Sequence, residues 1–226
     1  MNLHIIWGES HVTGTPGQDC VLKGGAGIHH SLGQTITPTS NLTLYAKWSN
    51  VLGYWESDAD SIGRWNSTPS VYKKKLNSNV SFYFMTGESH ARTQWNGAGI
   101  STTTTTDKDT ANIRVYGGSY NELISEESWV DMAPDDTGYA ISNFVYEKDY
   151  YYNGSIKTGN IYVAARIAIR DRGATVDEYC KTSTHELGHT LGWEGHANGS
   201  SNIMYRYASS VTTLTDVDKR HLQQVY

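Results

Sequence analysis

The sequence predicts an α+β fold, in which a twisted, mostly parallel sheet carries an active-site helix and a C-terminal helix and is preceded by a small β-rich module. Candidate strands come first along the chain, and the strongest helical pattern starts only after residue 174. Strands followed by helices favour a sheet with helices laid on it. Tyr, Trp, Thr, Ser, Asn and Gly are frequent while Phe and Pro are scarce, as is typical of extracellular β-rich proteins.

Length and charge narrow the classes of function. The chain has 226 residues, enough for one medium domain and a small appendage. Its 18 Lys and Arg against 23 Asp and Glu give a formal charge of -5, so no nucleic-acid partner is expected. No run of about 18 apolar residues is present, so no membrane span is expected. The apolar stretch Leu3–Trp7 is too short for a signal peptide, so secretion has to be inferred from the domains.

Residues 1–50 are expected to form the small β module, and residues 51–226 the main domain. Glycine-rich turns lead into the sequence LTLYAKW at residues 42–48, where apolar and polar side chains alternate as in a half-buried strand. Its ending TLYAKW resembles the close of a Listeria–Bacteroides-type β repeat, which occurs on secreted and surface proteins of bacteria. Ser49–Gly53 is the expected joint.

Beyond the joint, apolar runs predict the strands of the sheet. The segment between residues 90 and 100 is interpreted as a loop or a short helix, and the stretches 55–66 and 73–76 are polar with scattered aromatic residues. The predicted strands cover residues 80–85, 111–116, 139–146 and 160–169.

A helix from about 176 to 191 is the firmest structural prediction. Thr175 and Glu178 have the spacing of a capping box, in which a hydroxyl and a carboxylate satisfy backbone N–H groups at a helix start. Gly192 suits the turn that ends a helix. The apolar residues at roughly helical spacing are Val176, Tyr179, Cys180, Leu187 and Leu191.

The helix carries the residues of a metal site. His185 and His189 are four residues apart, so their side chains leave one face about 5–6 Å apart and can bind one ion. Glu186 lies a third of a turn away, where it can reach a metal-bound water without being a ligand. This is the place of a general base in metal-assisted hydrolysis.

A catalytic Zn²⁺ site needs a third protein ligand, and three places downstream of His189 offer one. In the thermolysin-like arrangement the third ligand is a glutamate from a second, downstream helix. Glu194 is the only glutamate after His189, but it directly follows the end of the first helix and lies in no second one. Asp216 and Asp218 remain as an aspartate alternative. His196 follows the glycine turn at once and is the simplest third ligand.

These residues resemble the metzincin clan of zinc metalloproteases, and most closely its matrixin-like branch, whose pattern is HExxHxxGxxH followed by a Met-turn. His185, Glu186, His189 and Gly192 match that pattern, whereas His196 comes after three intervening residues instead of two. Met204 in the sequence SNIMY is similar to the Met-turn methionine. The closing stretch LTDVDKRHLQQVY is similar to the family's C-terminal helix. This likeness implies that Asp216 and Asp218 lie at a helix start, where carboxylates favour the helix dipole, so they are not expected to be ligands. Gln94-Trp95-Asn96 faintly resembles the family's first helix.

The sequence departs from the clan at two places. Arg206 stands where some members have a tyrosine near the metal, so a tyrosine ligand or oxyanion stabiliser is not carried over. Cys20 lacks the surroundings of the cysteine that caps zinc in matrixin propeptides. Cys20 and Cys180 are expected to be two buried free thiols, with one long-range disulfide as the alternative.

The resemblance implies a secreted or cell-surface zinc endopeptidase of bacterial type that acts on proteins or peptides. His185, His189 and His196 would hold Zn²⁺, while Glu186 would act as general base towards a metal-activated water and pass the proton to the leaving amine. The alternative is a zinc-bearing surface or binding module without proteolytic activity. The intact Glu186 disfavours it, because a site without catalysis has no need of a base.

Overall fold

The computed structural model describes residues 20–24, 29–30, 44–48, 50–126 and 129–226. The chain divides into two compact units, one made of Met1–Gly53 with Lys148–Lys157 and the other of Tyr54–Glu147 with Thr158–Tyr226. The domain boundary near residue 50 stays a prediction, since much of the expected N-terminal module lies outside the described residues. None of the described helices combines the length and apolar character needed to cross a membrane.

The first unit contains a small antiparallel sheet with the strand order β2-β1-β3. Its strands are β1 (Cys20–Gly24), β2 (His29–His30) and β3 (Leu44–Trp48). The alternating stretch before residue 49 therefore does form a strand over its described part. A short strand β4 (Asn50–Val51) pairs in parallel with Tyr150 and Tyr151.

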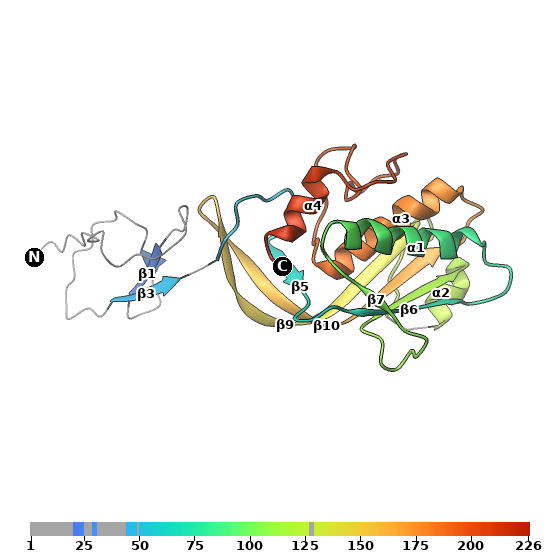
Figure 1. The fold of residues 1–226 in the computed structure, drawn as a ribbon, viewed down its shortest axis with the longest axis horizontal. Helices are drawn as coiled ribbons and strands as arrows, with labels where there is room; N and C mark the ends of the chain where they lie inside the picture. The colour runs from blue at the N-terminus through green and yellow to red at the C-terminus, as the bar shows by residue number, and fades with distance from the viewer. Residues whose placement is uncertain (1–19, 25–28, 31–43, 49, 127–128) are drawn as a thin grey trace, which may run out of the picture. The chain divides into compact units, whose positions relative to one another are not determined.

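The larger sheet has seven strands in the order β4-β9-β10-β8-β6-β7, and β5 pairs with β10 beside this path (Figure 1). Most neighbouring strands of this sheet are parallel: β10 pairs with both β5 and β8, and β6 pairs with both β8 and β7. A two-residue turn at Asn153 and Gly154, both with positive φ, joins β9 to β10 and makes that pair a hairpin. The strands are β5 (Ser61–Arg64), β6 (Ser70–Lys75), β7 (Thr103–Thr104), β8 (Ile113–Gly118), β9 (Gly138–Tyr152) and β10 (Ser155–Arg170).

Two long helices lie side by side over one face of this sheet (Figure 1). They pack around a core that includes Phe84, Trp95 and Leu187, and the Trp95 indole donates a hydrogen bond of 2.9 Å to the Thr184 carbonyl. On the opposite face, Leu123 of the short helix α2 packs against Tyr116 of β8. The helices are α1 (Tyr83–Gly97), α2 (Tyr120–Glu126), α3 (Val176–Leu191) and α4 (Asp216–Gln223). The α+β class with a mostly parallel sheet is thus confirmed.

One sequence expectation about an element was wrong, and two polar stretches hold strands that were not predicted. Residues 80–85 are not a strand, because residues 83–85 form the start of α1. Phe84 of that helix is buried, whereas Phe82, just before the helix, is 74% exposed. The same helix takes in residues 90–97, so the helix alternative for 90–100 is confirmed for most of that segment, as part of a longer helix. The polar stretches 55–66 and 73–76 contain β5 and part of β6, whose positions depend on parallel pairing with distant strands.

Candidate metal centre

Helix α3 has the ends that the sequence predicts. The Thr175 hydroxyl accepts a hydrogen bond from the Glu178 backbone N–H, and the Glu178 carboxylate accepts one from the Thr175 N–H, which completes the capping box. Gly192 ends the helix with φ +121°, and a Cβ there would lie 1.9 Å from the Gly63 carbonyl oxygen. Only a glycine lets α3 end this close to β5.

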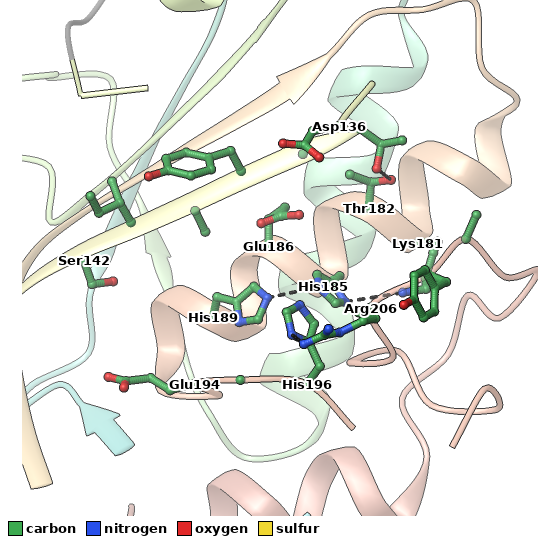
Figure 2. A pocket seen from close by; sticks show the side chains of 18 of the residues that line it. Asp136, Ser142, Lys181, Thr182, His185, Glu186, His189, Glu194, His196 and Arg206 are labelled. Carbon is green, nitrogen blue, oxygen red and sulfur yellow. Dashed lines mark hydrogen bonds between the residues drawn. The ribbon is translucent and has the colours of Figure 1, made fainter. Parts of the chain in front are cut away.

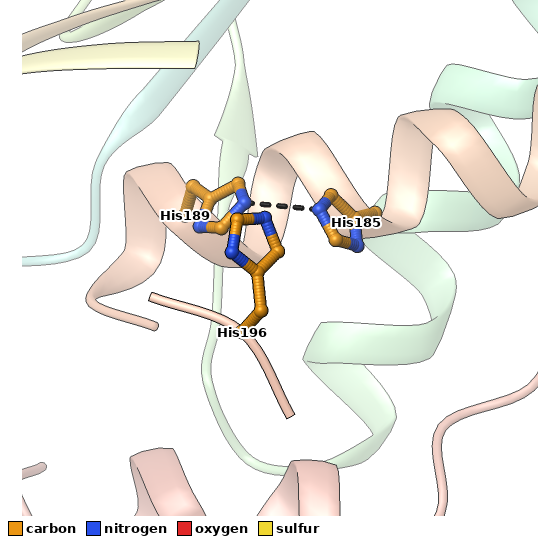
Figure 3. Close-up of side chains that lie close together, drawn as sticks. All are labelled: His185, His189 and His196. Atoms are coloured by element: carbon orange, nitrogen blue, oxygen red, sulfur yellow. Dashed lines mark hydrogen bonds between the residues drawn. The ribbon is translucent and has the colours of Figure 1, made fainter. Parts of the chain in front are cut away.

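Three histidines converge beside the C-terminal half of α3 (Figure 3). The ring Nε2 atoms of His185 and His189 are 3.0 Å apart. The His196 ring comes from the turn after the helix, with its centroid 5.4 Å from that of His185 and 5.1 Å from that of His189. One nitrogen from each ring lies within 4.8 Å of the others, so the three histidines can hold a metal ion.

Backbone carbonyls orient the two helix histidines. Nδ1 of His185 lies 2.8 Å from the Ile203 carbonyl oxygen, and Nδ1 of His189 lies 2.7 Å from that of Trp193. Because a carbonyl only accepts, each Nδ1 carries the hydrogen and each Nε2 lone pair is directed into the cluster. Burial lowers the pKa of His189 to about 4 and the pKa of His185 well below its usual value. Both rings are therefore neutral near pH 7, as metal binding requires.

Glu186 projects into the same cavity as the histidines (Figure 2). Its side chain is buried, and within the described residues no hydrogen bond engages its carboxylate. Burial raises the pKa of this carboxyl to about 8. A buried acid without a hydrogen-bond partner among the described residues, next to the neutral imidazoles of His185 and His189, has the environment of a catalytic base.

The cavity has a volume of about 640 Å³ and opens along β9. The start of β9 forms one wall, α3 forms the floor, and residues 206–209 border the other side. A Cβ on Gly138 would lie 2.6 Å from a Glu186 carboxylate oxygen, so β9 begins directly over that side chain. An extended chain lying in the cavity would therefore pass close to both Glu186 and the histidines.

Met204 lies beneath α3, fully buried. Its sulfur would be 2.6 Å from a Cβ on Gly188, which is the helix residue just before His189. The backbone N–H groups of Ile203 and Met204 donate to the buried Asp218 carboxylate at 3.0 and 3.1 Å. The expected Met-turn methionine thus lies under the histidine pair, fixed from α4.

Glu194, Asp216 and Asp218 were the alternative ligands, and none belongs to the histidine group. The Glu194 carboxylate accepts hydrogen bonds from the Ser61 hydroxyl and, at 3.0 Å, from the Tyr162 hydroxyl. Asp216 is 91% exposed in the first turn of α4, and Asp218 caps that helix with Thr215. The carboxylates are occupied elsewhere, which leaves His196 as the candidate third ligand.

Sequence reasoning missed two residues around the centre. Lys181 is buried one turn before His185, and its ammonium donates to the carbonyls of Ile203 and Tyr205, on both sides of Met204. Burial lowers the pKa of this lysine to about 8. The i, i+4 spacing from Lys181 to His185 was a possible signal. Asp218 was expected only as a helix cap, and nothing in its local sequence indicates the bonds to Ile203 and Met204.

The expectation of two buried free thiols can be checked for only one of the two cysteines. Cys180 is a buried free thiol on α3, and burial raises its pKa. The side chain of Cys20 lies outside the described residues, so the expectation for that thiol stays untested.

Comparisons with known proteins give little beyond this geometry. No family model matches the sequence, and no curated protein matches it. Two solved structures, "Structure of myroilysin" and "Crystal structure of myroilysin", are each 14% identical to this chain over 72% of its length. They match over 95% and 85% of their own chains with TM-scores of 0.38 and 0.40. Such low similarity assigns no family, and the chain stands as an α+β protein whose three convergent histidines can hold a metal ion.

Proposed function

We propose that this protein is a zinc-dependent endopeptidase of metzincin type, in which His185, His189 and His196 hold the ion and Glu186 is the general base. The observation that carries the proposal is the buried Glu186 carboxylate, which no described residue engages in a hydrogen bond, beside three convergent imidazoles in one cavity. A site that merely stored a metal would have no use for an unpaired acid there, because burying it costs free energy.

The donor set fits the proposed ion. Three imidazoles are a usual ligand set for catalytic Zn²⁺, which keeps a further position open, and backbone carbonyls hold Nδ1 of two of them, His185 and His189. When bound, the ion would supply Lewis acidity towards the scissile carbonyl and make a water more acidic. Glu186 would accept the proton of that water and later deliver it to the leaving amine.

The cavity wall supports a peptide as substrate. In the described part, β4 pairs with β9 only at Tyr150 and Tyr151, so the edge of β9 next to the cavity has no strand partner. An extended peptide could add to this edge as a further strand, with its scissile bond near Glu186. A peptide that pairs with β9 through its backbone groups does not need a free terminus at the site, which favours cleavage of bonds inside the substrate chain.

The metzincin assignment rests on the HExxHxxGxxxH spacing together with Met204 under Gly188. An extracellular or cell-surface location is proposed on the same resemblance and on the repeat-like ending TLYAKW of the N-terminal module. A zinc-bearing module without proteolytic activity is the outcome to be excluded.

The test measures metal content and peptidase activity together. Purified protein is expected to contain about one Zn²⁺ per chain, to cleave an unfolded protein substrate and to lose cleavage on chelation. Glu186→Gln should lower kcat by about 100- to 10,000-fold while retaining the metal. Glu178→Gln, a change of the capping glutamate on the same helix, is the matched control. Stoichiometric zinc with no cleavage would instead support the binding module, and full activity of Glu186→Gln would contradict the mechanism.

A further inference from the structure

The turn that delivers His196 is one residue longer than the metzincin pattern. It runs from Trp193 to His196, and Gly195 absorbs the extra length with φ +72°. A Cβ on Gly195 would lie 2.3 Å from a carboxylate oxygen of Asp58 and 2.4 Å from the Ser57 hydroxyl. The turn is therefore in tight contact with a chain segment almost 140 residues away in sequence, at separations of 137 and 138 residues.

That segment, Glu56–Ser61, runs along the outside of the turn and is called the brace here. The Ser57 hydroxyl donates to the Glu194 carbonyl, and the Ser61 hydroxyl donates to the Glu194 carboxylate. The Glu56 carboxylate accepts a hydrogen bond of 3.3 Å from the Asn198 N–H. The brace therefore forms hydrogen bonds with the backbone and the side chain of Glu194 in the turn, and with the backbone of Asn198 just after the turn.

Asp58 is the part of the brace that contacts the histidine itself. One carboxylate oxygen accepts the His196 backbone N–H at 2.8 Å. The other forms an ion pair of 2.8 Å with Arg206, whose guanidinium lies 3.4 Å from Nδ1 of His196. The carboxylate therefore fixes the main chain of His196 and, through Arg206, a cation beside its ring.

We propose that Asp58 is a positioning residue for His196: its hydrogen bond to the His196 N–H directs the imidazole of the lengthened turn into the histidine cluster. The inference rests on the proposed metal centre and adds a residue that the motif does not contain. His196 has no helix to orient it, unlike His185 and His189, so its direction depends on contacts made from outside the turn.

The effect should be on metal binding more than on folding. The Asp58 and Arg206 side chains are 49% and 47% exposed, and ion pairs at such exposure contribute little to stability. Residues that orient a metal ligand, in contrast, typically change metal affinity by about 10- to 100-fold when they are removed. A residue that served only the fold would show the opposite pattern.

The experiment uses the full chain with Co²⁺ in place of the native ion and measures the visible absorption spectrum, together with Zn²⁺ affinity by competition with a chromophoric chelator. Asp58→Ala should weaken Zn²⁺ binding by about 10- to 100-fold and change the Co²⁺ spectrum towards that of His196→Ala. Asp58→Asn keeps an oxygen that can accept the His196 N–H, so it should recover most of the affinity. Asp109→Ala, which removes an exposed aspartate from its contact with Arg114, is the matched control and should bind like wild type.

The outcomes separate this inference from the proposed function. If wild-type protein binds neither Zn²⁺ nor Co²⁺ at the histidines, the metal centre itself is wrong. If wild type binds while Asp58→Ala matches Asp109→Ala, or Asp58→Asn is no better than Asp58→Ala, the metal centre stands and the role of Asp58 is refuted. Far-UV circular dichroism checks folding, and Asp58→Ser takes the place of Asp58→Ala if the alanine variant does not fold.

Discussion

Glu88, Asp218 and Glu186 are all buried acids, but their surroundings differ. Glu88 forms ion pairs with Lys73 and Arg92, and Asp218 accepts hydrogen bonds from the backbone N–H groups of Ile203 and Met204. Glu186 has no such partner among the described residues. Its position in the HExxH pattern could be identified from the sequence, whereas its isolation could not, because isolation depends on what β9 brings over the helix.

The isolation of Glu186 predicts a pH-dependent stability difference. Since burial raises the pKa of Glu186 from 4.5 to about 8, the folded metal-free protein holds a proton that the unfolded chain releases between these values. The stabilising contribution is present below about pH 4.5 and is lost as pH rises through about 8. Glu186→Gln does not titrate, so after chelation it should be more stable than wild type at pH 8.5, by on the order of a few kcal/mol, and equal to it at pH 4. Urea unfolding at both pH values measures the difference, and a constant gap would contradict it.

At the scale of elements, α3 was predictable because all its signals are local. The capping box, the apolar stripe and Gly192 lie within one continuous segment, and the structure reproduces the expected bounds. Helix α1 was misjudged, since the aromatic run at residues 82–84 favours a strand when it is considered alone. Strand β5 was missed because its four residues contain one large apolar side chain, and it is fixed by pairing with β10.

The hydrogen bonds from Ile203 and Met204 to α4 predict a difference in stability between variants of two neighbouring aspartates. Asp218→Ala would leave the buried N–H groups of Ile203 and Met204 without acceptors and should lower the free energy of unfolding by about 2–4 kcal/mol. Asp216→Ala, in the same helix turn but 91% exposed, should cause little change. Denaturant unfolding of the two variants checks this, and equal effects would show that Asp218 acts only as a helix cap.

At the scale of the whole molecule, the α+β class and the strands β8, β9 and β10 before α3 followed from the sequence, but the assembly of the site did not. His185, Glu186 and His189 are set by one helix. His196 depends on the brace, which no periodic pattern connects to it. The brace begins only a few residues after Gly53, the last residue of the N-terminal segment of the first compact unit.

The position of the brace in the sequence predicts how far the chain can be shortened from its N-terminus without loss of Zn²⁺ affinity. A chain that begins at Tyr54 keeps the brace and the hydrogen bond from the Tyr54 N–H to Gln224, so it should retain Zn²⁺ affinity close to that of the full chain. A chain that begins at Ile62 lacks the brace and should lose at least as much affinity as Asp58→Ala, about 10-fold or more. Chelator competition measures both, and equal affinities would contradict the prediction.

The turn from Trp193 to His196 also bears on how such proteins are found by sequence pattern. Hydroxyl and carboxylate groups from a distant segment hold this turn in place. Its length can therefore differ from that of turns that are stabilised by hydrogen bonds among their own residues. A search that demands two residues between the helix-ending glycine and the last histidine rejects this chain, in which three intervene. A pattern that allows either length, and that looks for a Ser-Asp pair well upstream, would recover chains built in this way.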